Sequence, residues 1–410
     1  MPFDSRVITD PARGAIAATS LATVDPATGT ASEIRNGAVA WEDGVLTYVG
    51  PAGGLGGGVW AERFDGCTIA PGFVDAHTHL PFVGWRADEF ETRLAGVSYR
   101  ELHGEGGIYR SARLLAEADD DEVLAFCVPL VREMADLGTT ALELKTGYGL
   151  SVEAELRQAR LARRLADEAP QRCSVTLLAA HAVPHGVGRE AWVRLACDEL
   201  IPAAAAEDLV DAVDVYVEDI AFTVDDLQAI AEAAAGAALP LRCHADQLGP
   251  SAAAEAAVAL GARSADHLNH VSAEGIGALA GSAATTAVLL PTSTFILRTT
   301  PPDARGLLDA GARVAIASDL NPGTSPIASM PEVIAMACSL YGFTPLEALA
   351  AATFAPARIL GFEGSRGTLT PGRAADLVVL DGDAFRQVPY RPGHAPVLHS
   401  FVAGRRVGGR

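Results

Sequence analysis

The 410-residue sequence contains very little lysine and no cysteine motif. Lys145 is the single lysine, and the other 30 basic residues are arginine, which we attribute mainly to compositional bias. The six cysteines are dispersed and form no C-x-x-C pair. Dispersed cysteines in a large chain without a secretory signal are usually reduced, buried and inert, so we expect no disulfide framework.

Long apolar runs and targeting signals are absent as well. No apolar run approaches the ~20 residues that a membrane-spanning helix needs, so no membrane partner is expected. The first residues lack a basic start followed by an apolar stretch, and we therefore expect no secretory signal and a cytoplasmic location. The glycine-rich stretch Gly53–Trp60 is not a phosphate-binding loop, because no strand leads into it and no G-K-[ST] follows.

The net charge of −20 limits the classes of partner. A surface of this sign repels nucleic acid and anionic membranes, so neither is expected to bind. A small anionic substrate would need a local cation at its binding site.

The two ends of the chain share a strand-rich pattern. Residues 1–68 and 363–410 contain short alternating apolar segments. These segments are separated by turn signals at Asp43-Gly44, Pro371-Gly372 and Ala403-Gly404. We expect the two ends to form one small β-sandwich domain.

The middle of the chain, residues 69–362, alternates strand-like segments with Ala- and Leu-rich helical stretches such as Val152–Ala169. Eight segments are candidate strands: 73–76, 140–144, 174–180, 212–217, 239–243, 264–266, 287–290 and 313–318. Eight β/α units and this length predict an α/β fold, a (β/α)8 TIM-like barrel with the β-sandwich domain built from both chain termini.

Histidines gather at the ends of these predicted strands, where such barrels carry their chemistry. Five of the ten histidines in the chain lie just beyond a strand: His77, His79, His181, His244 and His267. His77 and His79 are two residues apart in an extended segment, so both side chains point the same way. With His244 after the fifth strand and Asp319 after the eighth, they predict a site for one divalent or trivalent metal, zinc or iron.

A metal at this site would lower the pKa of a bound water towards ~7. Asp319 could both ligate the metal and accept the proton of that water. His267 could hydrogen-bond the nucleophile or the tetrahedral intermediate, or it could only support the ligands. Lys145 could be carbamylated and bridge two metals, but it leads into a glycine-flanked tyrosine loop, so we favour a structural ion pair and a single metal.

Longer stretches of the sequence resemble a known superfamily. The stretch "PGFVDAHTH", the strand-end histidines, the "SD" before Leu320 and the tail "GTLTPGRAADLVVLD" are similar to those of amidohydrolases. More specifically, "HTHLPFVGWRADEF", "KTGYGL", "AHAVP", "HADQL", "ADHLNH" and "SDLNPGTSP" resemble the imidazolonepropionase family. That resemblance implies hydrolytic opening of the ring of 4-imidazolone-5-propanoate to N-formimino-L-glutamate in histidine catabolism, with one zinc or iron per chain and a homodimer.

The resemblance also implies roles for individual residues. His77, His79, His244 and Asp319 match metal ligands. From their chemistry we expect Asp319, His267 and His181 to be the catalytic residues. The implied substrate-binding residues are Arg86 for the propanoate carboxylate, Tyr148, His181 and Gln247 around the ring, and Asn321, Gly323 and Thr324 in a covering loop.

Alternatives remain open at several positions. Arg86 could instead form a salt bridge with Asp88 or Glu89, and Tyr148 could simply pack its loop. Some family members carry glutamate where Gln247 stands, and a glutamine cannot take a proton, so we expect Asp319, with His267, to carry that role. Glu105 departs from the family's glycine triplet. The rival function is an amidohydrolase-type nucleobase deaminase of the guanine or cytosine class, which shares the ligand set but not Arg86 and the "TGYG" loop.

Overall fold

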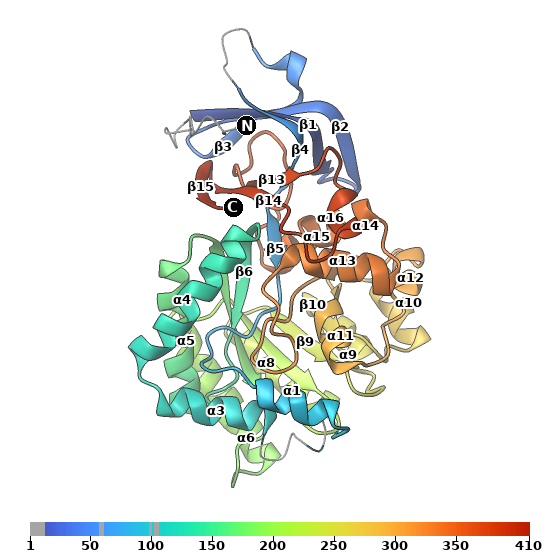
Figure 1. Cartoon of the computed structure of the whole chain (residues 1–410). Helices are drawn as coiled ribbons and strands as arrows, with labels where there is room; N and C mark the ends of the chain where they lie inside the picture. The colour runs from blue at the N-terminus through green and yellow to red at the C-terminus, as the bar shows by residue number, and fades with distance from the viewer. Residues whose placement is uncertain (1–12, 57–60, 98–100, 102–105) are drawn as a thin grey trace.

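The structure is a computed structural model that describes residues 13–56, 61–97, 101 and 106–410. Glu105 and residues 57–60 of the glycine-rich stretch lie outside the described residues. Figure 1 shows a small sheet domain at one end of the molecule and a barrel surrounded by helices below it. Among the described residues, no helix is long and apolar enough to cross a membrane.

Both ends of the chain contribute to the small domain, as predicted. Its seven strands form one sheet in the order β15-β14-β13-β4-β1-β2-β3. Their bounds are β1 Arg13–Val24, β2 Ala31–Glu42, β3 Val45–Pro51, β4 Glu62–Pro71, β13 Leu377–Asp381, β14 Val397–Val402 and β15 Arg405–Gly408. The predicted turn signals at Asp43-Gly44 and Ala403-Gly404 join β2 to β3 and β14 to β15.

This sheet curls around its own core. Trp41 of β2 and Phe401 of β14 lie with ring centroids 5.8 Å apart, although three strands separate β2 from β14 in the sheet. Neighbouring strands are spaced by about 4.8 Å, so a flat sheet would hold the two rings much farther apart. The domain is therefore sandwich-like, with apolar side chains such as Ile16, Ile69 and Leu377 enclosed between its two halves.

Eight parallel strands form the barrel, in the order β12-β11-β10-β9-β8-β7-β6-β5. Their bounds are β5 Phe73–Asp75, β6 Thr139–Lys145, β7 Arg172–Ala180, β8 Ala212–Val217, β9 Leu241–Ala245, β10 Ser264–His267, β11 Thr286–Leu289 and β12 Val314–Ile316. All eight predicted strands are thus confirmed. The fifth starts two residues later than predicted because Pro240 cannot donate to the ladder.

The first and last barrel strands meet just beyond their ends. Thr78 and Leu320 form a parallel bridge, and the backbone N–H of His79 donates to the carbonyl of Leu320 at 2.8 Å. Below this bridge, the hydroxyl and backbone N–H of Ser318 both donate to Asp75. The closing seam of the barrel therefore lies at the level of the predicted metal ligands.

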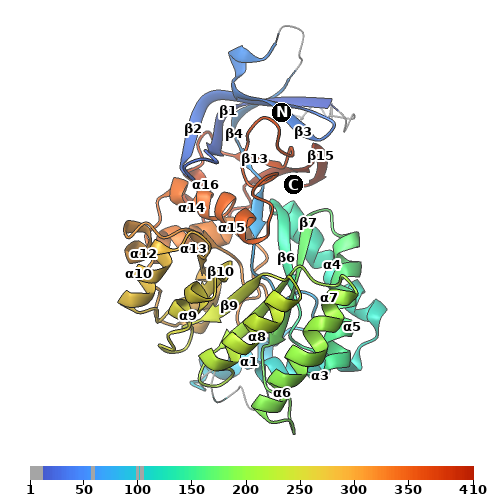
Figure 2. The same cartoon turned by 180° about the vertical axis from the view of Figure 1, so that it is seen from behind.

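Helices cover the outside of the barrel, as Figures 1 and 2 show. Their bounds are α1 Ala87–Leu94, α3 Gly107–Glu117, α4 Asp120–Asp136, α5 Val152–Glu168, α6 Arg189–Leu195, α7 Ile201–Ala206, α8 Val224–Gly236, α9 Ala253–Ala259, α10 Ala273–Gly281, α11 Pro291–Leu297, α12 Ala304–Asp309, α13 Met330–Tyr341, α14 Pro345–Ala351, α15 Phe354–Ile359 and α16 Gln387–Tyr390. The predicted helix at Val152 is α5, and Ser151 caps it by accepting from the N–H of Ala154.

Candidate active site

The four residues assigned to a metal come together at the barrel mouth. Nε2 of His79 lies 3.2 Å from Oδ1 of Asp319, and Nε2 of His77 lies 3.6 Å from the same oxygen. The ring of His244 is 4.5 Å from that of His77, centroid to centroid. All four side chains are buried.

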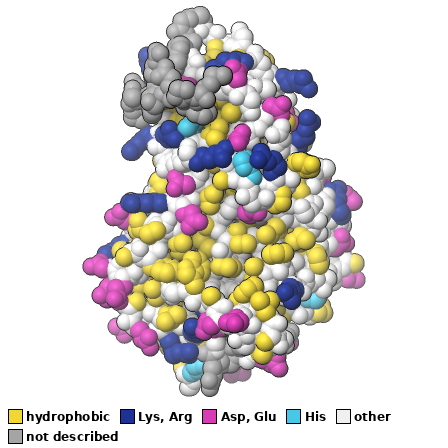
Figure 3. All heavy atoms as spheres, in the orientation of Figure 1, with side chains coloured by type: hydrophobic (Ala, Val, Ile, Leu, Met, Phe, Trp, Pro, Cys, Tyr) yellow, Lys and Arg dark blue, Asp and Glu magenta, His cyan; other side chains and the backbone are white. Residues whose placement is uncertain are grey.

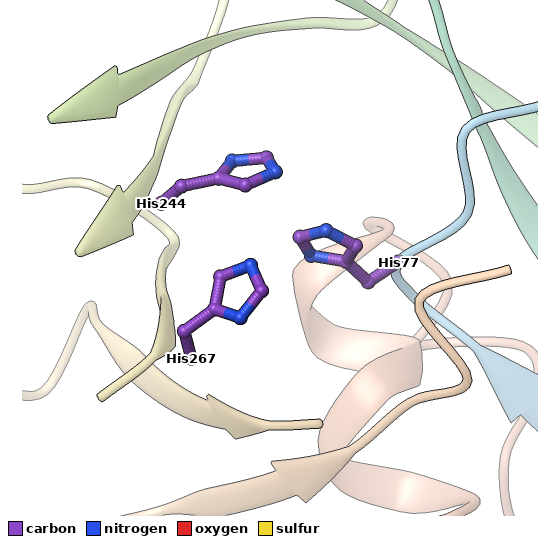
Figure 4. A group of neighbouring side chains, drawn as sticks. All are labelled: His77, His244 and His267. Carbon is purple, nitrogen blue, oxygen red and sulfur yellow. The ribbon is translucent and has the colours of Figure 1, made fainter. Parts of the chain in front are cut away.

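His267 stands closer to this group than the sequence indicated. The ligand atoms of His77, His244 and His267 all lie within 4.8 Å of one another, as do those of His77, His79 and Asp319. Figure 4 shows the three rings of the first group pointing toward one another, from the loop after β5 and from strands β9 and β10. His77 belongs to both groups, so one ion beside it would also be within reach of His267.

The chemistry of these donors fits a metal ion. Nε2 of His77 and Nε2 of His244 are buried and have no hydrogen-bond partner in the part of the chain that the structure describes. Leaving such an atom buried and unpaired is costly, whereas an imidazole nitrogen is a strong ligand for zinc or iron. Three imidazoles with one carboxylate form an ordinary catalytic donor set for these metals.

Burial also sets the protonation state that a metal requires. Burial lowers the pKa of His77 well below its usual value, and it lowers the pKa of His267 to about 3. Burial opposes ionisation of Asp319, but a hydrogen bond from His79 and the neighbouring imidazoles keep its pKa below the usual range. These shifts favour neutral imidazoles at His77 and His267 and an ionised carboxylate at Asp319, the forms that bind metals.

Two aspartates behind the ligands orient the imidazoles. Nδ1 of His77 donates to Asp266 at 2.6 Å, and Nδ1 of His244 donates to Asp214 at 3.1 Å. Because each carboxylate takes the Nδ1 proton, each Nε2 is left with a lone pair facing the site. Neither aspartate lies beyond a strand end, which is where the sequence search for site residues was directed.

Lys145 forms the ion pair that was favoured from the sequence. Its ammonium lies 2.6 Å from Asp214 and 2.8 Å from Glu143, and all three side chains are fully buried. Two carboxylates at this distance stabilise an ammonium, whereas they would repel an anionic carbamate. The geometry therefore supports a single metal.

A narrow pocket opens onto the candidate metal ligands. Its lining residues are His79, Arg86, Ile108, Tyr148, His181, Tyr216, His244, Gln247, His267, Asp319, Asn321 and Thr324. The sequence missed Tyr216, which lies within β8 rather than beyond it, and Ile108, which belongs to α3. The pocket has a free volume of about 30 Å³, room for a water molecule or so.

Arg86 places a guanidinium at the edge of this pocket. The residue is 3% exposed, and its Nη1 has no hydrogen-bond partner among the residues that are described. Its Nε lies 3.5 Å from Glu89, a long ion pair, while Asp88 pairs with Arg110 instead. A Cβ at Gly323 would lie 1.9 Å from Nη2 of Arg86, so the covering loop needs glycine there for the guanidinium to fit.

Asn321 is occupied within the covering loop itself. Its Oδ1 accepts from the N–H of Gly323 at 2.9 Å and from both the N–H and the hydroxyl of Thr324. Its Nδ2 donates to the carbonyl of Asp319 at 2.7 Å. The amide therefore fixes the loop to the backbone of Asp319, while Asn321 also lines the pocket, so its predicted contact with the substrate stays a prediction.

His181 and Tyr148 lie side by side at the pocket wall, with ring centroids 5.4 Å apart. Nδ1 of His181 donates to the carbonyl of Gly147 at 3.0 Å, because a carbonyl can only accept. Nε2 of His181 is then an acceptor in the neutral ring and a donor only in the imidazolium. His181 can therefore donate to a substrate oxygen only when doubly protonated.

Gln247 is held through its backbone. Its N–H donates to Oε1 of Glu218 at 2.6 Å, and the next N–H, of Leu248, donates to the same oxygen at 2.8 Å. Burial raises the pKa of Glu218 to about 7. Glu218 is not among the residues that line the pocket, so its position identifies it as a support for the Gln247 segment.

Solved structures share this architecture. An adenosine deaminase from Xanthomonas campestris with bound zinc is similar with a TM-score of 0.72 and 19% identity, covering 96% of this chain and 92% of that chain. The guanine deaminase of E. coli has a TM-score of 0.71 and 16% identity, covering 97% and 100%. At these identities the likeness concerns the fold alone.

Sequence relatives are more specific. Residues 68–407 match the Amidohydrolase family. The imidazolonepropionase of Rhizorhabdus wittichii is 42% identical over 375 residues, covering 90% of this chain and 94% of that protein. That of Caulobacter vibrioides strain NA1000 is 41% identical over 389 residues, covering 93% and 96%. The chain therefore belongs to the amidohydrolase family and, within it, to the imidazolonepropionases.

Proposed function

We propose that this chain hydrolyses 4-imidazolone-5-propanoate to N-formimino-L-glutamate with one zinc or iron ion. The observation that carries this proposal is the buried guanidinium of Arg86 at the pocket that contains the metal-site residues. A guanidinium fork binds a carboxylate through two parallel hydrogen bonds. Guanine and cytosine have no carboxylate for Arg86 to bind, so the pocket favours the propanoate over the rival deaminase substrates.

His77, His79, His244 and Asp319 would hold the metal, and His267 lies close enough to join them. A metal bound there would lower the pKa of a coordinated water and polarise the atom under attack.

The side chains of the pocket then have separate tasks. Arg86 binds the carboxylate of the substrate and Tyr148 seats its ring. Asp319 accepts a proton from the attacking water and delivers it to the leaving ring nitrogen, because Gln247 has no basic group. When neutral, His181 accepts a hydrogen bond from an N–H of the substrate ring at Nε2. As the imidazolium, it donates a hydrogen bond from Nε2 to the oxygen of the ring. Proton delivery to nitrogen allows the ring C–N bond to break and gives the formimino product.

The first test follows the reaction directly. Metal-loaded protein is mixed with freshly generated 4-imidazolone-5-propanoate, loss of the imidazolone absorbance is recorded, and the product is identified by mass. We expect decay to formiminoglutamate that a chelator abolishes. Decay at the rate of the enzyme-free solution, together with ammonia release from guanine or cytosine, would refute the proposal in favour of a deaminase.

Arg86→Ala tests the carboxylate contact, with Arg93→Ala as its matched control. Arg93 lies on the same helix α1 and donates to the carbonyl of Gly323 at 3.0 Å, but it does not line the pocket. We expect Arg86→Ala to raise KM by ~10–100-fold, the loss expected for a charge-assisted hydrogen bond, and Arg93→Ala to raise it far less. Equal effects of the two variants would mean that Arg86 only supports the loop.

We further propose that the chain forms a homodimer. Apolar side chains gather across the barrel face seen in Figure 3, and the exposed apolar residues include Phe295 of α11 and Leu340 of α13. Such patches are typical of protein–protein contacts. Light scattering coupled to size-exclusion chromatography measures the mass, and a monomer at micromolar concentration would contradict the proposal.

A further inference from the structure

The single lysine of the chain occupies a special place. Lys145 is the last residue of β6 and is fully buried in the barrel interior. The sequence uses arginine at its other 30 basic positions. A bias this strong makes the one lysine informative, because a compact ammonium and a planar guanidinium are not interchangeable when buried.

The contacts of Lys145 lead to a metal-site histidine in two steps. Its Nζ donates to Oδ2 of Asp214 at 2.6 Å. The other oxygen of Asp214, Oδ1, accepts from Nδ1 of His244 at 3.1 Å and from the N–H of Val215 at 2.7 Å. Each carboxylate oxygen thus has its own donors, and Lys145 fixes the oxygen that faces away from the imidazole.

The barrel interior around Lys145 contains two carboxylates that a compact ammonium can bridge. Glu143 precedes Lys145 by two residues on β6, so both point into the barrel. Lys145 bridges Glu143 and Asp214, two carboxylates on different strands, at 2.8 and 2.6 Å. A guanidinium does occur in this interior, at Arg242, where it contacts Glu143. Arg242 lies two residues before His244 on β9, one layer farther from the metal site.

We propose that Lys145 is a positioning residue for the metal centre. Its ammonium anchors the Asp214 carboxylate so that this carboxylate holds His244 with Nδ1 protonated and Nε2 turned toward the metal site. The inference rests on the metal site of the proposed function, and it concerns the affinity of that site rather than the identity of the substrate.

The test compares Lys145→Met, Asp214→Asn and the double variant by their zinc dissociation constants, measured against a chromophoric chelator. Lys145→Met should raise the constant by ~10–100-fold, the usual effect of losing support behind a ligand. Asp214→Asn should also raise it, because an amide has one acceptor and cannot satisfy both the ammonium and Nδ1–H. Removing the ammonium relieves that conflict, so the double variant should bind zinc no more weakly than either single variant.

A matched control separates this role from a merely structural ion pair. Arg366 and Asp376 form a partly buried ion pair beside the sheet domain, and neither residue lines the pocket or belongs to the candidate metal ligands. Arg366→Met should lower the Tm of the metal-free protein but leave the zinc dissociation constant within about two-fold, since distant sites act independently. Should Lys145→Met fail to fold, Glu143→Gln combined with Lys145→Met removes one negative and one positive charge together and serves in its place.

Three results would overturn the inference. Folded Lys145→Met protein that binds zinc within about two-fold of the wild type would leave Lys145 a structural ion pair only. Effects of Lys145→Met and Asp214→Asn that multiply in the double variant would show that the two act separately. A wild-type protein that binds no zinc or iron would overturn the metal site itself, and the inference with it.

Discussion

Substitution of Gly323 by alanine offers a sharp test of the substrate pocket. The φ angle of Gly323 lies outside the left-handed region, so alanine can adopt its backbone, and the cost is steric. The new Cβ would lie 1.9 Å from Nη2, 2.3 Å from Nε and 2.4 Å from Cζ of Arg86. To regain van der Waals contact the guanidinium must withdraw by roughly 1.5 Å.

A shift of that size is larger than a bidentate carboxylate contact tolerates. Losing a charge-assisted hydrogen bond costs about 1.5–3 kcal/mol, which corresponds to a rise in KM of roughly 10–150-fold at about 1.4 kcal/mol per factor of ten. In the proposed complex, the ring of the substrate reacts beside the candidate metal ligands and not beside Arg86, so kcat should change much less. Steady-state kinetics on 4-imidazolone-5-propanoate, with Tm recorded alongside, measures both.

The matched control is Gly364→Ala. A Cβ at Gly364 meets no atom within 4 Å, so its KM should equal that of the wild type. A Gly323→Ala enzyme with unchanged KM would refute the assignment of Arg86 to the substrate carboxylate, because the guanidinium cannot remain in place beside the new methyl group.

Three further predictions concern the metal, the proton path and pH. Asp319→Ala should abolish turnover, and a variant that keeps near-normal kcat with full metal content would contradict the role of Asp319. Chelation should lower the Tm of the metal-loaded protein, since a ligand at ~1,000 times its Kd stabilises by about 4 kcal/mol; an unchanged Tm would mean that no metal is bound. Burial, with Arg406 nearby, lowers the pKa of His399 in β14 from 6.5 to about 4. The unfolded chain therefore gains this proton before the folded one, and stability is lost as the pH falls from about 6.5 to 4. His399→Gln should flatten the decline of Tm across that window, and a parallel decline in both proteins would contradict it.

The pattern of the sequence was sufficient to predict the barrel and much of its mouth. Strands such as β8 are short apolar runs between helical stretches, and the two-residue spacing of His77 and His79 determines that they share a direction in any extended segment. Because parallel strands all end at one face, residues just beyond different strands must meet there. These two rules were enough to predict that His244 and Asp319 lie beside His77 and His79.

Other features depend on distances that a sequence does not contain. Position along the chain places His267 at a strand end, but only the packing of β9 against β10 shows that its ring lies among the ligand atoms. Asp214 and Tyr216 are inside β8, where an inward polar residue cannot be distinguished from a core position by spacing. The resemblance implied a substrate contact for Asn321, and only the hydrogen-bond geometry shows that its amide also organises its own loop.

The candidate metal site spans the seam between the first and last barrel strands. His77 and His79 lie on one side of the Thr78–Leu320 bridge, and Asp319 lies on the other. An ion held by both sides would be a cross-link that closes a loop containing nearly the whole barrel. In the chain-entropy description, such a link lowers the conformational entropy of the unfolded chain and so stabilises the folded state by about 5 kcal/mol. Ion affinity and barrel closure would then be one linked equilibrium, so any condition that loosens the seam would also release the ion.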